Sequence, residues 1–363
     1  MEKFSKRVQS LMPEGAYFVL EKAKRLETKG KKIIHLEIGQ PDFPTFENIS
    51  TAGIQAIQNG HTHYTPSAGS IDLRQAIAED AGGRRNVNFT YNQVVVGPGA
   101  KPALFFPTLA LIEPGDEVIY PDPGFPTYKA MIEVAGGTHT RLIILNSPSN
   151  PTGGVISQNT LEYIAEKAIE HDFWVLSDEI YSRLVYEDEA PSIISLPGME
   201  ARTIICDGFS KTYSMTGWRL GYGIMPTTLA ERVSLLLTHS VGSTADFTQV
   251  AGIEAIQGDQ IQVEKVVEMY RERRDVLVQG LNNIPGISCR NPKGAFYVFP
   301  NVSSFGRPSV EIAEYILEYA GVALLPGTSF GDFGEGYLRL CFANSLDNLK
   351  EAIEKISAAM EKL

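Results

Sequence analysis

The sequence has 363 residues, 43% of them hydrophobic and 21% charged, which is typical of a folded protein with one large core and room for a smaller domain. Its formal net charge of −11 disfavours a nucleic-acid partner, because phosphate backbones are bound by basic surfaces. The longest apolar stretch, residues 103–112, is too short to span a bilayer, and the first residues lack the apolar core of a signal peptide. We therefore expect a cytoplasmic protein without membrane contact.

Cysteine and histidine residues give no sign of a metal site. Cys206, Cys289 and Cys341 are widely spaced and odd in number, which predicts buried free thiols in a reducing compartment. His61 and His63 lie close together, but no third ligand follows at a suitable spacing. We expect no bound metal.

The N-terminal part of the chain is predicted to alternate helices, strands and turns. Apolar residues at helical spacing predict a helix over residues 13–29, and an apolar run predicts a strand over residues 33–38. The strand leads into GQPDFP, residues 39–44, where the glycine allows close approach of the backbone to a ligand. Ser70 is a candidate cap for the next helix.

A glycine-rich turn follows the next expected strand. Residues 94–96 form that strand, and GPGAK, residues 97–101, opens an apolar helix. The free N–H groups and the positive dipole of such a helix start can bind phosphate, although similar turns also occur without ligands. Pro107 removes one backbone hydrogen bond inside this helix and predicts a kink or break.

Every later strand of the series also ends in polar or glycine-rich residues. The expected strands cover residues 117–120, 142–145, 173–177 and 203–206. They are followed by PDPGFP, NPTG, DEIY and GFSKT respectively. Because the carboxyl ends of parallel strands meet at one edge, where open α/β sheets bind ligands, this series predicts a mainly parallel sheet with a ligand lying across that edge.

Three polar residues at these strand ends are candidates for chemistry. Asp178 and Glu179 are adjacent, so at most one faces a given site, and we choose Asp178. The alternative for this pair is a salt-bridged helix cap. Lys211 can either hold a phosphate or react as an amine nucleophile with a carbonyl group.

The C-terminal part has a different composition. Helical patterns are expected from Arg219 to about residue 281, followed by strands at residues 294–300, 323–326 and 337–342 and by helices at residues 310–319 and at the C-terminus. We expect a large domain over residues 45–280 and a smaller α+β domain built from residues 1–44 and 281–363.

These motifs together resemble the class I/II aminotransferases, the pyridoxal-phosphate enzymes of fold type I, and the aspartate aminotransferases among them. The most specific motif is SKTYSMTGWRLGY, residues 210–222, and the resemblance extends from IGQPDF near the N-terminus to YLRLCFANS at residues 337–345. It implies an α/β fold with a large, mainly parallel mixed sheet flanked by helices, a smaller α+β domain, pyridoxal 5'-phosphate as the cofactor, and a homodimer.

The resemblance also implies roles for the residues around the cofactor ring. Lys211 would carry the cofactor as a Schiff base and move the proton at the substrate Cα. Asp178 would pair with the pyridine nitrogen, and Tyr181 and Asn150 would hydrogen-bond the phenolic oxygen. Phe125 would stack on the ring.

Further residues would hold the phosphate and the substrate. The phosphate ligands implied by the resemblance are the backbone of Ala100 and Lys101, the side chains of Ser210 and Arg219, and Tyr64 from the other subunit. Arg339 would bind the substrate α-carboxylate in a bidentate manner, with Gly39 and Asn150 beside it.

The family usually has an additional strand and helix just before Leu142, so this chain is shorter there by roughly twenty residues if elements of ordinary length are missing. Either the protein has lost them or the sequence lacks them. No proposed site residue lies in the affected segment, residues 137–141.

The expected function is amino transfer between an L-amino acid and a 2-oxo acid by a ping-pong mechanism. Lys101 matches a position that recognises a distal carboxylate in aspartate-type members, so aspartate and 2-oxoglutarate are the first candidates. Tyr17, Phe18 and Phe125 leave aromatic or aliphatic substrates open. A β-lyase on the same scaffold is the alternative. A phosphate-binding protein without chemistry is a remote third, because the spacing before Lys211 is not that of a P-loop.

Overall fold

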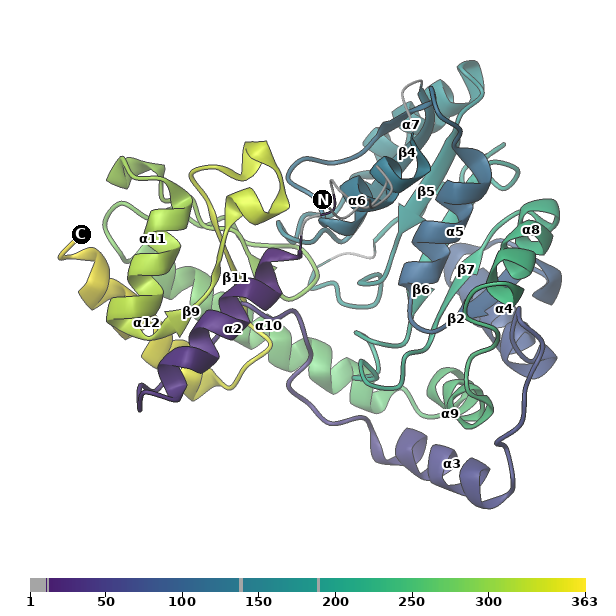
Figure 1. Cartoon of the computed structure of the whole chain (residues 1–363), viewed down its shortest axis with the longest axis horizontal. Coiled ribbons are helices and arrows are strands. Elements are labelled where there is room, and N and C mark those ends of the chain that lie inside the picture. The colour runs from purple at the N-terminus through teal and green to yellow at the C-terminus, as the bar shows by residue number, and fades with distance from the viewer. Residues whose placement is uncertain (1–10, 12, 137–139, 188–189) are drawn as a thin grey trace, which may run out of the picture.

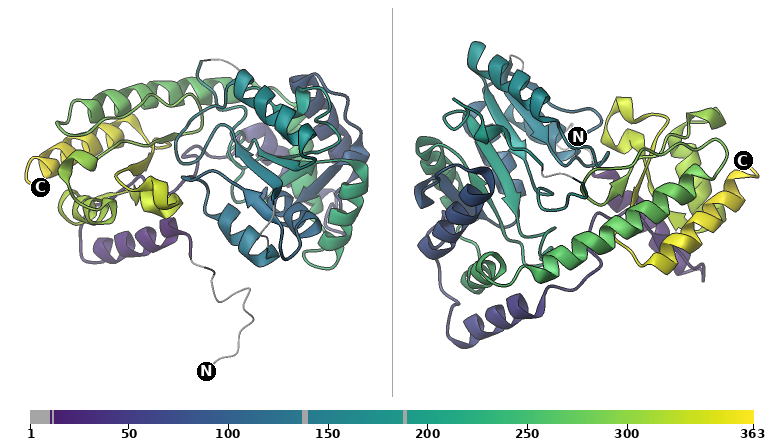
Figure 2. Two further views of the ribbon diagram at one scale, coloured as in Figure 1. Left: turned by 90° about the horizontal axis from the view of Figure 1, so that it is seen from above. Right: turned by 180° about the vertical axis from the view of Figure 1, so that it is seen from behind.

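The computed structural model describes residues 11, 13–136, 140–187 and 190–363. Its elements form two parts, one around a six-stranded sheet and one around two smaller sheets. The long helix α10 (Ile261–Asn282) runs from one part to the other in all views (Figures 1 and 2).

The six-stranded sheet has the order β2-β7-β6-β5-β4-β3. Its strands are β2 (Val94–Gly97), β3 (Glu117–Ile119), β4 (Thr140–Asn146), β5 (Trp174–Asp178), β6 (Thr203–Gly208) and β7 (Gly221–Ile224). β3, β4, β5 and β6 are parallel, whereas β7 is antiparallel to both of its neighbours. All strands except β7 therefore end at the same edge, and the predicted mixed α/β sheet is confirmed.

Strand β7 was not predicted, because the residues after Arg219 were expected to be helical. β7 is only four residues long and contains two glycines, so it lacks the alternating pattern that identifies a strand. Its partners fix it instead, because it inserts between β2 and β6 and pairs with both.

Alternate residues of the central strands pack into two cores on opposite faces of the sheet. On one face, Val94 and Ile205 pack beneath α4 (Ile71–Arg85) and α9 (Asp246–Gln257). On the other face, Val95 and Ile204 belong to a core completed by three helices. These are α5 (Lys101–Leu111), α6 (Thr127–Ala135) and α8 (Thr227–Thr238). Because both faces are covered, the strands are continuously apolar. Two further helices are α3 (Glu47–Gln58), which packs on α9, and α7 (Gln158–Glu170).

Helix α5 continues through Pro107, so the expected break is not found. Pro107 is buried in the helix, and the next residue, Thr108, donates a hydrogen bond from its hydroxyl to the carbonyl of Leu104 at 2.8 Å. This side-chain bond and the surrounding apolar packing stabilise the turn that lacks one backbone bond.

The second part combines both ends of the chain. β1 (Ile34–His35) pairs in parallel with β9 (Val322–Ala323). A three-stranded antiparallel sheet contains β10 (Leu325–Pro326), β11 (Leu338–Cys341) and β8 (Tyr297–Val298) in that order. Three helices cover these sheets (Figure 1). They are α2 (Gly15–Glu27), α11 (Ser309–Tyr315), which continues as a π-helix over Ile316–Ala320, and α12 (Leu346–Met360).

Three further expectations concern local features. The three cysteines are buried and unbridged, as predicted. Among the helices described, none has the length and hydropathy of a membrane span. Of the shortened segment at residues 137–141, residues 137–139 lie outside the described residues, and residues 140 and 141 are the first two of β4.

Replacing Leu277 with Ala should destabilise the protein strongly. Leu277 lies on α10 and has no exposed surface, so truncation removes apolar contacts and leaves a cavity, at a cost of about 2–5 kcal/mol. Thermal unfolding should show a clearly lowered midpoint. Met269→Ala on the same helix is the matched control, because Met269 is 36% exposed. Equal shifts for both variants would contradict the assignment of Leu277 to the core.

Candidate active site

Lys211 lies in the turn that follows β6 at the common edge of the parallel strands. Its Nζ atom donates a hydrogen bond to the backbone oxygen of Gly39 at 2.6 Å and lies 5.6 Å from the ring centre of Phe296. Burial of the amine, with the nearby positive charges of Arg339 and Arg219, lowers the pKa of Lys211 to about 8. A substantial fraction of this amine is therefore neutral near physiological pH.

Asp178 and Glu179 contact different partners, as their alternation on the chain predicts. Asp178 ends β5, is 4% exposed and accepts a hydrogen bond from the hydroxyl of Tyr128 at 2.6 Å. Burial raises the pKa of Asp178 to about 6, although the Tyr128 hydrogen bond acts in the opposite direction. Glu179 instead forms an ion pair with the buried Arg85 at 2.6 Å. Only Asp178 is left without a cationic partner among the described side chains.

Arg339 is a buried cation in β11 whose contacts are all neutral. Its Nη1 atom donates to Asn150 Oδ1 at 3.4 Å, and its Nη2 atom donates to the backbone oxygen of Glu37. The guanidinium carbon lies 4.5 Å and 5.1 Å from the ring centres of Tyr297 and Phe330. Arg339 is 3% exposed, its Nε has no hydrogen-bond partner, and no carboxylate of the described chain pairs with it.

Tyr297 connects several of the predicted residues. Its hydroxyl is 2.8 Å from the hydroxyl of Tyr181, and its ring lies beneath the Arg339 guanidinium. A Cβ atom added at Gly39 would lie 2.0 Å from the same hydroxyl, so glycine is required there by close packing. Burial raises the pKa of the Tyr181 phenol well above its usual value, which keeps it protonated.

The GPGAK turn and Arg219 form a second group at the same edge. The Nη2 atom of Arg219 donates to the backbone oxygen of Pro98 at 3.4 Å. A Cβ atom at Gly221 would lie 2.4 Å from the backbone nitrogen of Ala100, so β7 packs directly on this turn. Arg219 itself has φ 54°, a left-handed conformation that non-glycine residues adopt mostly where surrounding contacts require it. The guanidinium and the start of α5 thus present positive charge together.

Of the remaining predicted residues, some lie beside the residues described above and others lie apart from them. Ser210 is buried next to Lys211, and Phe125 lies edge-on to Tyr128 with ring centres 5.7 Å apart. Tyr64 is 99% exposed and contacts none of the residues above. Lys101 forms an ion pair with Glu14 at 2.5 Å.

Sequence reasoning missed three residues of the site. Tyr297 lies in an apolar stretch, where an aromatic residue is usually core, and Tyr128 lies past the PDPGFP turn at the start of a helix. Asn146 ends β4 and donates from its amide to the backbone oxygen of Asp178 at 3.1 Å, while it accepts from the backbone nitrogen of Asn150 at 2.8 Å. Its position at a strand end was the only available signal.

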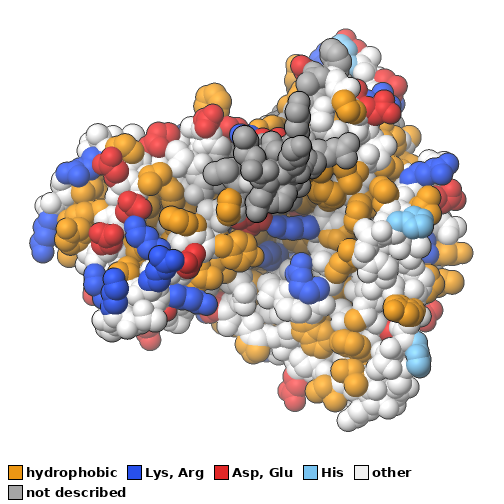
Figure 3. Space-filling model, viewed as in Figure 1, with side chains coloured by type: hydrophobic (Ala, Val, Ile, Leu, Met, Phe, Trp, Pro, Cys, Tyr) orange, Lys and Arg blue, Asp and Glu red, His pale blue; other side chains and the backbone are white. Residues whose placement is uncertain are grey.

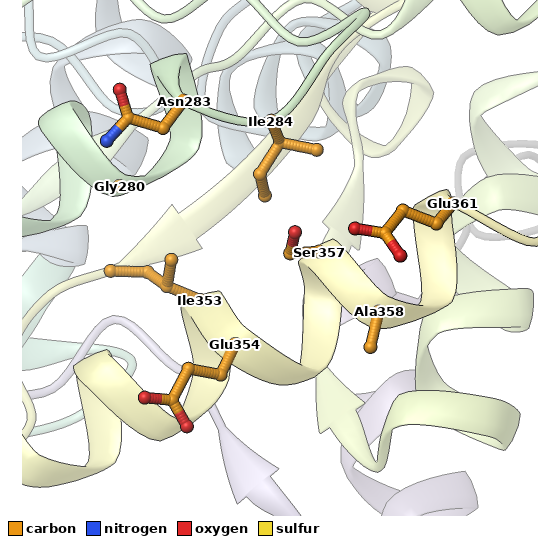
Figure 4. A pocket seen from close by; sticks show the side chains of 8 residues that line it. All are labelled: Gly280, Asn283, Ile284, Ile353, Glu354, Ser357, Ala358 and Glu361. Atoms are coloured by element: carbon orange, nitrogen blue, oxygen red, sulfur yellow. The ribbon is translucent and has the colours of Figure 1, made fainter.

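The surface around the site is hollowed and basic. Lys and Arg side chains gather in the hollow between the two parts in Figure 3. A separate groove lies between the ends of α10 and α12 (Figure 4) and is lined in part by Ile353, Glu354 and Glu361. None of the predicted site residues lines that groove. Within the described residues no cluster of metal-binding side chains occurs.

Comparison with known proteins agrees with this fold. The family model for aminotransferase class I and II matches residues 31–142 and 137–356, two matches that overlap at the segment expected from the sequence to be shortened. An aspartate aminotransferase of Pyrococcus horikoshii is 37% identical over 94% of this chain and 93% of its own length. The structure of Thermus thermophilus aspartate aminotransferase with maleate has a TM-score of 0.95 at 35% identity, covering 99% of this chain and 100% of that one. An aromatic aminotransferase of Pyrococcus horikoshii has a TM-score of 0.89 at 35% identity, covering 94% and 99%.

The mixed α/β sheet has a buried amine, a buried carboxylate and a glycine-rich helix start at one edge, where open α/β sheets bind ligands. The chain belongs to the class I and II aminotransferase family. It is therefore an enzyme of the transferase type, the predicted aminotransferase function is confirmed at this level, and the β-lyase alternative is not favoured.

Replacing Asp178 with Asn should change the pH dependence of stability in the cofactor-free protein. Asp178 has a folded-state pKa of about 6, against about 3.9 in an unfolded chain. The folded state thus holds this proton more tightly, and ionisation costs stability as the pH rises from about 4 to about 6. Over that range the wild type should lose up to roughly 3 kcal/mol relative to Asp178→Asn, at about 1.4 kcal/mol per pKa unit.

Urea unfolding midpoints between pH 4 and pH 7 measure this difference. Asp172→Asn is the control, because the Asp172 side chain is 92% exposed and should give a profile parallel to that of the wild type. A parallel profile for Asp178→Asn as well would show that burial does not perturb Asp178.

Proposed function

We propose that this enzyme exchanges amino groups between an L-amino acid and a 2-oxo acid by a ping-pong mechanism, with pyridoxal 5'-phosphate as its cofactor. The observation that carries the proposal is the combination of a largely desolvated amine, Lys211, with a buried guanidinium, Arg339, that has no carboxylate partner among the described residues. Such a guanidinium fits a substrate carboxylate, and such an amine fits a proton acceptor.

The residues present fit this cofactor in charge and chemistry. An anionic phosphate matches the start of α5 at Ala100 and Lys101, the hydroxyl of Ser210 and the guanidinium of Arg219. Asp178 matches a protonated ring nitrogen, Tyr181 and Asn150 match a phenolic oxygen, and Phe125 offers an aromatic face. When bound, the cofactor stabilises negative charge at the substrate α carbon and stores the amino group between half-reactions.

The protein's own groups would then bind, orient and deprotonate the substrate. Arg339 binds the α-carboxylate through two parallel hydrogen bonds, assisted by Asn150 and by the backbone at Gly39. Lys211 would be the Schiff-base lysine that holds the cofactor, and its amine would move the proton at the substrate Cα. Its lowered pKa, about 8, supports this role because the amine gives up its own proton easily.

For the substrate we propose a dicarboxylic pair, aspartate and 2-oxoglutarate, as the first candidates. Lys101 begins α5 beside Phe125, with Nζ 5.3 Å from the ring centre, and supplies a cation at the edge of the site. Relatives named for aspartate and for aromatic substrates occur at similar identity, which keeps aromatic substrates as the second candidate.

We also propose a cytoplasmic homodimer in which Tyr64 completes the phosphate site of the other subunit. Tyr64 is 99% exposed within one chain, which is unusual for a large aromatic residue. Other apolar side chains on the same part of the chain are exposed as well, namely Ile54, Ile57 and Ile71. A partner subunit would cover such residues.

Each subunit would consist of a large domain over residues 45–280 and a small domain of residues 1–44 and 281–363. Support comes from the pairing of β1 with β9 and from the core shared by Ala23, Ile33 and Leu317, which join the two ends of the chain.

Replacing Lys211 with Ala should abolish steady-state amino transfer, with a loss of at least about 100-fold, because no other amine replaces the proton acceptor. The absorption band of covalently bound pyridoxal phosphate should be lost as well. Lys293→Ala, an exposed lysine outside the site, should keep both properties. Exchange of amino groups at the wild-type rate by Lys211→Ala would contradict the mechanism. Turnover of an amino acid without any oxo-acid acceptor would instead indicate a lyase.

Replacing Tyr64 with Ala should weaken cofactor retention by roughly tenfold or more if one charge-assisted hydrogen bond of about 1.5–3 kcal/mol is lost. Equilibrium dialysis of the dimer against pyridoxal phosphate measures this affinity, and sedimentation verifies that the dimer persists. Tyr319→Ala is the control, because Tyr319 is also exposed, at 75%, but lies on the other part of the molecule. Unchanged cofactor affinity in Tyr64→Ala would show that the cross-subunit assignment is wrong.

A further inference from the structure

One carboxylate joins three segments at the edge of the site. Glu14, the residue before α2, accepts a hydrogen bond from Lys101 Nζ at 2.5 Å and another from the hydroxyl of Thr127 at 3.3 Å. Lys101 begins α5, and Thr127 begins α6. A carboxylate from the start of the chain is thus held against two helices of the large sheet.

The position of Glu14 is fixed by close packing. The next residue, Gly15, packs on Ser329, and a Cβ atom added at Gly15 would lie 2.5 Å from the Ser329 hydroxyl. The same short segment continues into Phe330, whose ring lies beneath Arg339 at 5.1 Å. Glu14 therefore belongs to the wall of the site.

Lys101 and Arg339 are linked through one loop. Phe125 lies under the Lys101 amine, and the backbone nitrogen of the neighbouring Gly124 donates to the oxygen of Phe330 at 2.8 Å. Phe330 in turn contacts Arg339. A chain of contacts thus runs from Lys101 through Phe125, Gly124 and Phe330 to Arg339.

Lys101 and Arg339 differ in burial and in whether a carboxylate pairs with them. The Lys101 side chain is 51% exposed and that of Glu14 is 28% exposed, so water screens their ion pair and it exchanges partners easily. Arg339 is buried and has no anionic partner in the described chain. Arg339 thus attracts every substrate, whereas Lys101 is available only when Glu14 releases it.

We propose that Glu14 determines the preference between acidic and neutral substrate side chains by competing for Lys101. The inference rests on the proposed amino transfer. With a neutral side chain, aliphatic or aromatic, Glu14 remains paired and leaves no uncompensated charge beside the substrate. With an acidic side chain, the distal carboxylate of the substrate displaces Glu14 from Lys101. A ping-pong transaminase must accept two different substrates in one site, and this exchange of partners accommodates both classes.

Glu14→Gln tests the proposal, because glutamine keeps the size and the acceptor for Thr127 but removes the competing charge. The ratio of kcat/KM for aspartate to that for phenylalanine should rise roughly two- to fivefold, as expected for one exposed ion pair. The dissociation constant of maleate, a dicarboxylate without an amino group, should fall by a similar factor, and that of 3-phenylpropionate should not. Glu21→Gln is the matched control, because Glu21 lies on α2, the helix that follows Glu14, in an exposed ion pair with Arg25.

The double variant separates the competition from a general change of charge. In a Lys101→Gln background, Glu14→Gln should no longer alter the aspartate-to-phenylalanine ratio or the affinity for maleate. An unchanged ratio in the single variant, or an equal change with and without Lys101, would overturn the proposal. Failure of the wild type to transaminate any donor would instead reject the proposed function, and the maleate measurements would still report on Glu14 and Lys101.

Discussion

The arrangement of the site depends on one unpaired buried charge, the guanidinium of Arg339. Burying an ion without a counter-ion costs several kcal/mol, so such a charge persists only where neutral groups partly compensate it. Asn150 and the backbone oxygen of Glu37 accept its hydrogen bonds, and Tyr297 and Phe330 present their ring faces. These contacts orient the guanidinium without neutralising it.

Two buried carboxylates, those of Glu37 and Glu179, are engaged by other cations. Glu37 is fully buried, yet its carboxylate accepts from His35 Nδ1 at 2.7 Å rather than from Arg339. The hydrogen bond and charge of Glu37 raise the pKa of His35 to about 9, so a cation two residues earlier in the chain balances this carboxylate. Glu179 is likewise engaged by Arg85. Because Glu37 and Glu179 have partners of their own, neither of them neutralises Arg339, whose positive charge stays available for anions.

The sequence was sufficient for the features that local chemistry determines. Glycine-rich and polar strand ends located the common edge of the sheet, and alternation along the chain separated Asp178 from Glu179. Features that depend on contacts between distant segments were not predictable. β7 is a strand because β2 and β6 flank it and pair with it. Helix α5 tolerates Pro107 because the hydroxyl of Thr108 and a packed core stabilise that turn. Tyr297 joins Tyr181 to Gly39 only after two strands of the C-terminal sheet have paired. The pairing of Glu14 with Lys101 spans 87 residues and has no local signature.

The two cations proposed to bind substrate, Arg339 and Lys101, differ in burial, and this difference fits the groups they would recognise. Water does not screen a buried guanidinium, and moving it would cost much free energy. Arg339 therefore suits the carboxylate that all amino acids and 2-oxo acids share. A half-exposed ammonium on a flexible side chain costs little to rearrange, so Lys101 suits the group that varies between substrates. Because the residue just before α2 supplies the carboxylate that competes for Lys101, the segment that leads into this helix contributes to selectivity although it contains none of the reacting groups.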